Sequence, residues 1–505
     1  MQSWWLAGSF LFLPGVWAMM GWLGGRAKTS NSRSTIYRVT LWTSGLALLL
    51  ISSASVLLNG NVISASHGAL FKFTTVNSII LPLVMFIAMI ILRFSHNYLS
   101  AEACYPRFFR WMMLTLTAVS VTLLTNHLVI FLLSWVAISL CLHKLLTLYP
   151  ERPRAILAAH KKFILARLAE LCLLGAFALL YMAHQTLFID ELLTNIGTGS
   201  AYLEHTAAVL IALAALIKCA QLPVHGWLIK VVEAPTPVSA LLHAGIINLG
   251  GYLLILFSPL IEFSAYGRWT LLVIAGISTL LASLILLTRV SVKVRLAWST
   301  SAQMGLMLIE CALGLYSLAL LHLVAHSLYK AFAFLNSGNA VNEQLQQELS
   351  GKLRAPARYW LPAGAFSLAV IAGAFTLFHE QGPIAPWVLL WMGITILMAT
   401  SAQKSTAVIA AVVLTGCYVL LKTSFGQFFD GQGITFLSAE DVFACLVFIN
   451  MFVFGLHLRF AHHKPWVQRL SAALFAGLYL DEWFTRSTLR FWPVAKSTLP
   501  LKQSQ

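Results

Sequence analysis

Apolar residues occur along this chain in runs long enough to cross a lipid bilayer, and short polar segments separate these runs. A helix of about 18 or more apolar residues spans the hydrocarbon core of a membrane. The pattern therefore predicts an all-α polytopic membrane protein of about 15 transmembrane helices. The expected spans are residues 4–24, 37–59, 77–99, 108–125, 127–149, 160–184, 206–230, 236–258, 269–288, 297–313, 316–338, 360–378, 385–400, 405–424 and 439–461.

Polar residues interrupt this pattern most clearly in residues 206–252. Lys218 lies about 12 residues into an apolar run, Pro223 follows it, and Pro235 and Pro237 precede the next apolar run. Buried charges are costly in hydrocarbon and usually face a bundle interior or a water-filled route. Broken backbone at membrane depth is tolerated beside protein or a hydrated cavity. The stretch predicts a helix broken near residues 218–235, at the centre of an ion or proton path.

The composition agrees with a membrane protein: 59% of residues are hydrophobic, 10% are charged, and the mean hydropathy is +0.81. The net charge of +16 is scattered between the spans, which favours the positive-inside rule over nucleic-acid binding. The basic loops alternate with loops poor in Lys and Arg, which predicts an N-terminus outside the cell and a cytoplasmic C-terminus. These loops carry Arg26, Lys28 and Arg33; Arg107 and Arg110; Arg152, Arg154, Lys161 and Lys162; Arg289, Lys293 and Arg295; and Lys352, Arg354 and Arg358.

The cysteines and the known nucleotide motifs exclude several kinds of site. The seven cysteines form no CxxC pair and mostly lie inside spans, which argues against disulfides and against a zinc or iron–sulfur site. Neither a phosphate-binding loop nor a dinucleotide-binding glycine motif occurs. Energy from ATP or from hydride transfer is therefore not indicated in this chain. Residues 1–24 lack a basic n-region and a clear cleavage site, so they predict a first transmembrane helix rather than a signal peptide.

Three ionisable residues inside the predicted spans are candidates for the path. Lys218 lies too deep in its run to reach a helix end easily, and burial beside a carboxylate suits a lysine to proton exchange. Arg167 and Glu170 are three residues apart on one helix face. They can form a structural ion pair, or Glu170 can serve as the carboxylate partner of Lys218.

Glu233, His225 and His243 flank the same break. Glu233 can cap the following helix, since acids are favoured at helix N-termini, or it can take part in conduction. Histidine titrates near neutral pH and suits proton transfer, although a buried histidine is often only a hydrogen-bonding group. We include all three in the candidate pathway.

A second group of polar residues lies in residues 316–338. His322, His326 and Lys330 recur at every fourth position and share one helix face, with about 6 Å of rise between neighbours. Direct hydrogen bonds cannot link them, so bridging water or side-chain motion is needed. Two histidines at this spacing can also bind zinc, but no HExxH motif is present. Glu310, deep in the preceding span, is a further candidate.

Residues 218–244 resemble a known family. The segments Lys218-Cys-Ala-Gln-Leu-Pro223-Val-His-Gly-Trp227 and Glu233-Ala-Pro-Thr-Pro-Val-Ser-Ala-Leu-Leu-His243-Ala are similar to the antiporter-like subunits of respiratory complex I and the Mrp antiporters. Within this similarity, the residues of the two segments are closest to the DabB family, the membrane subunits of a bacterial inorganic-carbon accumulation system. The His322-x3-His326-x3-Lys330 pattern also resembles the family, and the similarity covers roughly residues 110–340.

The chain departs from the complex I pattern at two places. Complex I subunits carry a glutamate at the position of Val136, and a further lysine in the span that here is residues 360–378 and uncharged. Lys218 therefore lacks the family's carboxylate partner. The exit half of the family pathway is incomplete in this sequence.

The resemblance implies a cation-conducting subunit of the bacterial inner membrane, with protons as the expected cation. It also implies a transport subunit without a cofactor of its own, and no enzyme by itself. Its partner would be a DabA-like peripheral protein that carries zinc and hydrates CO₂ to bicarbonate. The alternatives are an H⁺/Na⁺ antiporter or complex-I-like proton-translocating subunit, and a structural anchor for an enzyme. We expect three regions: N-terminal helices in residues 1–107, an antiporter-like core in 108–400, and C-terminal helices with a cytoplasmic or interfacial tail in 401–505.

Overall fold

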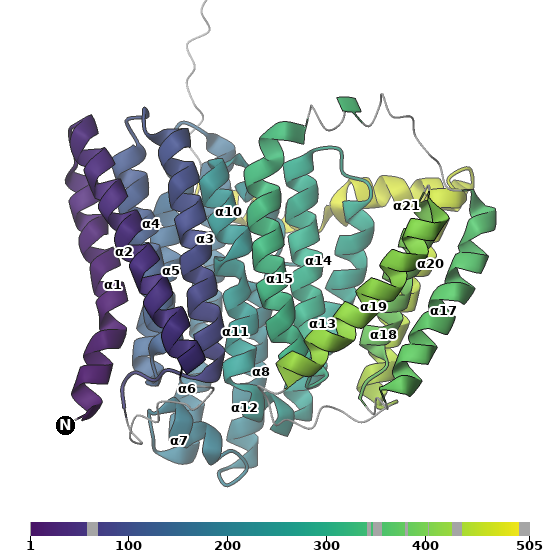
Figure 1. The fold of residues 1–505 in the computed structure, drawn as a ribbon, viewed down its shortest axis with the longest axis horizontal. Coiled ribbons are helices and arrows are strands. Elements are labelled where there is room, and N and C mark those ends of the chain that lie inside the picture. Colours follow the sequence, from purple (N-terminus) through teal and green to yellow (C-terminus); the bar gives the residue numbers. More distant parts are fainter. Residues whose placement is uncertain are drawn as a thin grey trace, which may run out of the picture. The chain divides into compact units, whose positions relative to one another are not determined.

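The protein is described here by a computed structural model that covers residues 2–57, 69–340, 345–346, 356–378, 382–401, 403–426 and 437–493. Helices dominate these residues, and the predicted all-α fold is confirmed (Figure 1). Within these ranges, twelve helices are long and apolar enough to cross a membrane. Helices α1, α14 and α18 occupy the three further positions that the sequence predicted as spans.

The helices at the predicted spans are α1 (Gln2–Arg26), α2 (Ser30–Leu57), α3 (Thr75–Leu99), α4 (Tyr105–Leu124), α5 (Leu128–Leu146), α6 (Pro153–His184), α8 (Ala201–Lys218), α10 (Thr236–Ala244) with α11 (Leu249–Leu256), α13 (Ala265–Leu286), α14 (Val292–Ala312), α15 (Tyr316–Leu335), α17 (Trp360–Leu377), α18 (Ala385–Thr400), α19 (Lys404–Gly426) and α20 (Ala439–Phe460). The shorter helices are α7 (Ile189–Thr194), α9 (Gly226–Lys230), α12 (Ser258–Phe263), α21 (Pro465–Phe475) and α22 (Leu480–Phe491).

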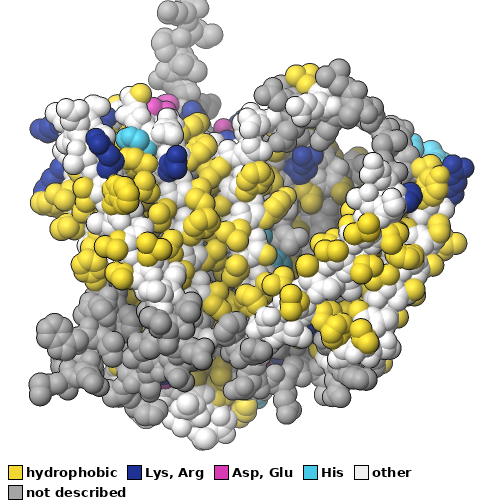
Figure 2. Space-filling view, in the orientation of Figure 1, with side chains coloured by type: hydrophobic (Ala, Val, Ile, Leu, Met, Phe, Trp, Pro, Cys, Tyr) yellow, Lys and Arg dark blue, Asp and Glu magenta, His cyan; other side chains and the backbone are white. Residues whose placement is uncertain are grey.

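Large apolar side chains are exposed along the helices, as expected of surfaces that face lipid. Trp42, Leu49 and Leu361 are 79%, 70% and 85% exposed. Figure 2 shows hydrophobic side chains along the flanks of the helices, with Lys and Arg side chains gathered near helix ends. A soluble protein rarely exposes so large an apolar area, so the surface agrees with the membrane spans.

The chain divides into two compact units. The first comprises Met1–Gly250, Ser327–Leu335 and Tyr479–Gln505. In it α1 packs on α4, α4 on α5, α5 on α6, and α6 on α8, while α22 near the end of the chain also contacts α6. Phe131 and Trp135 of α5 are fully buried in this unit.

The second unit comprises Gly251–His326 and Asn336–Leu478. Its centre is formed by α13, which packs on α14 and α20, and by α18, which packs on α17, α19 and α20. Asp441 of α20 is buried and accepts hydrogen bonds from the backbone N–H groups of Ile384 and Ala385, at 2.8 and 2.9 Å. The carboxylate thus satisfies free donors at the N-terminus of α18.

Two sequence expectations need correction. Residues 236–258 were expected to form one continuous helix, but α10 ends at Ala244 and a 3₁₀ turn over Ile246–Asn248 precedes α11. Gly245 allows this interruption, because its backbone leaves the helical region (φ −126, ψ −72). Lys161 and Lys162 were assigned to a basic loop, but they lie inside α6 and are 0% and 5% exposed.

Candidate functional site

The predicted break near residues 218–235 is present. Helix α8 ends at Lys218, α9 begins at Gly226, and α10 begins at Thr236. Between α8 and α9 lie Ala220 in the left-handed region (φ 51) and a cis peptide bond before Pro223. The backbone therefore leaves the helix directly after the lysine, and the side chain of Lys218 stands at the end of a helix in the interior of the unit.

Lys218 points at helices α5 and α6. Its Nζ lies 4.5 Å from the centre of the Trp135 ring, a cation–π distance. A cavity of about 20 Å³ lies beside it, lined among others by Ser139, Lys162, Glu170, Lys218 and Trp227. The rest of its walls are mostly apolar. A cavity of this size has room for about one water molecule, for which the polar side chains named here are the available partners. The structure thus places Glu170 and Lys218 on the same cavity.

Glu170 also forms the ion pair predicted from its spacing. Arg167 Nη2 donates to Glu170 Oε1 at 2.7 Å and to Ser139 Oγ at 3.1 Å. Lys162 donates to the carbonyl and the hydroxyl of Ser139, at 2.6 and 3.0 Å. One carboxylate therefore shares this region with three cationic side chains. A proton that moves here changes the electrostatic interactions among all four groups.

Lys162 and Ser139 were missed by sequence reasoning. Lys162 precedes Glu170 by eight residues, a spacing that places both on one face of α6, and this signal was available. Ser139 offered no signal, because it comes from α5 and only the packing of α5 on α6 brings it to the cavity.

Glu233 and His225 lie elsewhere. The Glu233 carboxylate is 3.7 Å from Arg154 and 43% exposed, and its carbonyl accepts from Arg152. Pro235 is the N-cap residue of α10. His225 is 2% exposed at the start of α9. Neither residue lines the Lys218 cavity as the described residues form it.

His243 is buried against the C-terminal half of α15. Its ring stacks on Phe334 with 4.2 Å between centres and 16° between planes. Asn248 Nδ2, beyond the interruption at Gly245, donates to Ser327 Oγ of α15 at 2.6 Å. Lys330, on the same part of α15, is 0% exposed. These contacts all belong to the first unit.

The second unit contains a carboxylate–imidazole pair. His322 Nδ1 of α15 lies 3.0 and 3.1 Å from the two carboxylate oxygens of Glu310 of α14. The ring centres of His322 and His326 are 6.2 Å apart, so the two rings do not hydrogen-bond directly, as the spacing predicted. Glu310 also lines a cavity of about 290 Å³ whose other walls are mostly apolar. Sequence spacing could not pair Glu310 with His322, because the two residues lie on different helices.

Among the described residues, no group of three or more His, Cys, Asp or Glu side chains is arranged to hold a metal ion. The expected placement of zinc in a partner chain remains a prediction.

Comparison with known proteins places this geometry in a family. The family described as NADH:quinone oxidoreductase/Mrp antiporter, TM, matches residues 125–416, which include the break, the Lys218 cavity and α15. Two solved structures share the fold: the Mrp complex from Dietzia sp. (TM-score 0.57, 20% identity, 97% of this chain and 58% of that chain) and the archaeal membrane-bound sulfane sulfur reductase (TM-score 0.59, 16% identity, 94% and 99%).

Curated relatives give a narrower assignment. The chain is 43% identical to the probable inorganic carbon transporter subunit DabB of Hydrogenovibrio crunogenus, over 98% of this chain and 96% of that protein. It is 36% identical to DabB2 of Halothiobacillus neapolitanus, over 97% and 95%. NADH-quinone oxidoreductase subunit L of Buchnera aphidicola is 30% identical over 59% and 50%. With a family match over more than half of the chain and full-length relatives of one kind, the protein belongs to the DabB group of the NADH:quinone oxidoreductase/Mrp antiporter family of membrane transport subunits.

Proposed function

We propose that this chain conducts protons, and that their flow energises accumulation of inorganic carbon by a peripheral, zinc-containing partner resembling DabA. The observation that carries the proposal is the cavity that Lys218 and Glu170 both line, at the end of a broken helix. An anchor would have no need to place the two ammonium groups of Lys162 and Lys218 and a carboxylate around space for a water molecule.

In the first unit, the proposed carrier is Lys218. A water in the cavity would stand between its ammonium and the Glu170 carboxylate, so that a proton can pass between them without large movement. Arg167, at 2.7 Å from Glu170, holds the carboxylate in place. In this proposal Glu170 replaces the glutamate that complex I subunits carry at the position of Val136.

In the second unit, the proposed carriers are Glu310, His322 and His326. The carboxylate and the imidazole of the first two are in hydrogen-bond contact, and His326 follows one turn later on α15. Lys330 continues the same face of that helix. Proton transfer from His322 onward needs water or rotation of the rings, because 6.2 Å separates the ring centres.

The coupling to carbon chemistry rests on the relatives, which are described as inorganic carbon transporter subunits. Hydration of CO₂ at neutral pH needs a metal that lowers the pKa of bound water. We therefore assign zinc and catalysis to the partner, at the cytoplasmic face of the bacterial inner membrane, and proton flow to this chain. The pattern of basic loops supports a C-terminus on that same side.

The function can be tested in a host that lacks carbonic anhydrase and so cannot grow in air. Co-expression of this chain with its partner should restore growth, and a protonophore should abolish uptake of labelled inorganic carbon. Uptake that survives the protonophore but stops when a sodium gradient is removed would favour the H⁺/Na⁺ antiporter reading. Equal uptake by the partner alone would leave this chain without the proposed role.

A further inference from the structure

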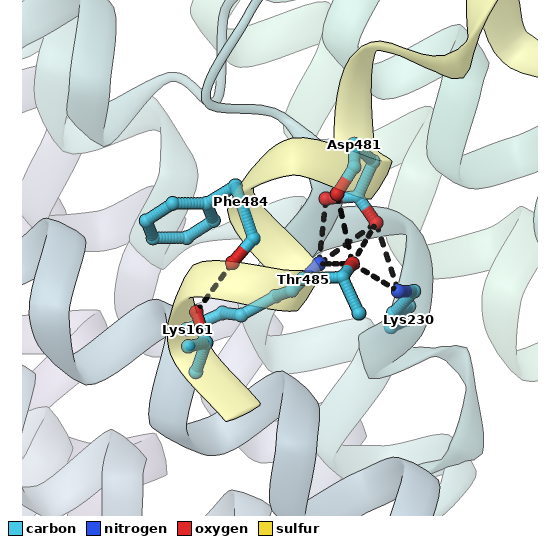
Figure 3. A network of polar contacts seen from close by, with 6 residues as sticks. Lys161, Lys230, Asp481, Phe484 and Thr485 are labelled. Atoms are coloured by element: carbon cyan, nitrogen blue, oxygen red, sulfur yellow. Dashed lines mark hydrogen bonds and ion pairs between the residues drawn. The ribbon is translucent and has the colours of Figure 1, made fainter. Parts of the chain in front are cut away.

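The end of the described chain contributes a carboxylate to the neighbourhood of the broken helix. Asp481 of α22 accepts two hydrogen bonds from Lys161 Nζ of α6, at 2.6 and 2.8 Å, and pairs with Lys230 Nζ of α9 at 2.8 Å. Thr485, one turn later, accepts from Lys230 at 3.0 Å. Figure 3 shows Asp481 and Thr485 pointing together at the two ammonium groups. One carboxylate thus joins three helices.

The charges make this contact strong. The Lys161 side chain is 0% exposed, and its ion pair is with Asp481. Burial by itself raises the pKa of the Asp481 carboxyl, but the hydrogen bonds and charges of Lys161 and Lys230 outweigh burial and hold the pKa below its ordinary value. The carboxylate is therefore ionised at neutral pH. Removal of one partner from such a buried pair leaves an uncompensated charge and is strongly unfavourable.

Helix α22 also packs closely against α9 and α6. A Cβ atom on Gly226 would overlap Asp481 Oδ1, so the carboxylate rests directly against the first residue of α9. At the far end of α22, the Trp492 ring stacks on His160 of α6 with 3.8 Å between centres. Helix α22 is therefore fixed to α6 at both of its ends.

Two residues that contact Asp481 are each followed in the chain by a residue that lines the Lys218 cavity. Lys161 precedes Lys162, and Gly226 precedes Trp227; both Lys162 and Trp227 are cavity-lining residues. The same carboxylate that fastens α9 to α6 therefore holds two parts of the wall of the cavity that Lys218 and Glu170 line.

We propose that Asp481 is a positioning residue for proton transfer: it clamps α9 to α6 through Lys230 and Lys161, and so holds the Lys218–Glu170 cavity at its working size. The inference rests on the proposed function. It also makes α22, which lies outside the segment matched by the antiporter family, part of the conducting machinery. Displacements of about 1 Å can slow a positioned reaction about a hundredfold.

The test uses two variants that break the same contact from opposite sides. Asp481→Asn removes the charge, and Gly226→Ala displaces the carboxylate. Glu482→Gln is the matched control, because Glu482 neighbours Asp481 on α22 but forms its ion pair with Arg486 one turn along the same helix, and its side chain is 54% exposed. In proteoliposomes, both test variants should conduct protons on the order of 10- to 100-fold more slowly than the control at equal amounts of folded protein.

Two readouts separate positioning from a merely structural role. The remaining flux of the test variants should show a changed pH profile, because Lys162, Arg167, Glu170 and Lys218 no longer keep their mutual distances. Acylation of Lys218 by a membrane-permeant amine reagent, followed by mass spectrometry relative to exposed Lys28, should increase in both test variants and stay constant in the control. This labelling does not depend on ion flow, so it also tests the clamp if the wild-type chain conducts no protons.

Wild-type flux in Asp481→Asn or in Gly226→Ala would overturn the proposal. So would a reduced flux with an unchanged pH profile and unchanged Lys218 acylation, because that result would show that the Lys218 cavity keeps its size without the contact. Absent flux in the wild type together with increased Lys218 acylation in the variants would overturn the proton-conducting function while leaving the clamp intact.

Discussion

Single side chains decide what the cavity in the first unit can do. Lys218 and Glu170 share about 20 Å³ of space, and Arg167 holds Glu170 from the other side. The Arg167–Glu170 pair could be predicted because both residues lie on one helix, three positions apart. Two other relations could not be predicted: Glu170 lines the same cavity as Lys218, and Glu310 contacts His322. Each relation joins two helices, and the spacing of residues along one helix does not describe how two helices pack.

At this scale we predict that Lys218→Ala reduces rescue of a carbonic-anhydrase-deficient host to the level of an empty vector. The chain should still reach the membrane, because alanine is tolerated at the end of an apolar helix. Lys144→Ala is the control, since Lys144 is an exposed lysine near the end of α5. Growth in air at comparable membrane abundance is the measurement, and normal growth of the Lys218 variant would remove Lys218 from the pathway.

His326 should matter far more than an exposed neighbour on the same helix. We expect His326→Ala to lower carbon uptake about tenfold or more, because a proton carrier is lost. Leu328→Ala, at a position that is 42% exposed, should have little effect. Uptake of labelled inorganic carbon at matched expression distinguishes the two; similar losses in both variants would indicate that α15 tolerates no change of packing.

At the scale of helices, apolar runs were sufficient to predict where the spans lie, because the bilayer sets the length of each run. They were not sufficient to predict the interruption at Gly245, since a glycine inside an apolar run is compatible with a continuous helix. The sequence did not predict the docking of α22 either. Its aromatic and charged residues would suit a membrane surface or a protein partner, and only its contacts show that Asp481 and Thr485 face α6 and α9.

Asp441 provides a test at this scale, because it joins two helices through backbone groups. Asp441→Ala should destabilise the protein by about 1–3 kcal/mol, since two buried N–H donors of Ile384 and Ala385 lose their acceptor. Asp441→Asn retains one acceptor oxygen and should lose less. Thermal unfolding in detergent measures both, and an unchanged midpoint in the alanine variant would show that the N-terminus of α18 finds other partners.

At the scale of the whole molecule, the sequence was informative because the motif in residues 218–244 is long and lies at the broken helix. The motif predicted the family, the broken helix and the site region together. It could not predict the contribution of α22, which follows Lys161 by about 320 residues and carries no motif of its own.

The division of labour between chains gives the last prediction. The purified chain should bind no stoichiometric zinc, whereas its complex with the partner should, because zinc needs three or four converging Cys, His or carboxylate ligands. Metal analysis of both preparations is the measurement. One zinc per isolated chain would contradict the assignment of catalysis to the partner, and a zinc-free complex that still accumulates bicarbonate would contradict the proposed chemistry.

The position of Asp481 in the chain also has a consequence for biogenesis. Lys161 emerges from the ribosome 320 residues before its counter-ion, a delay of roughly 15 to 65 s at ordinary rates of synthesis. We expect the ammonium group of Lys161 to remain accessible to water during that interval, because a buried charge without a counter-ion is unfavourable. The contact that joins α6, α9 and α22 can form only after Asp481 has been synthesised, so the wall of the Lys218 cavity is completed late in the synthesis of the chain.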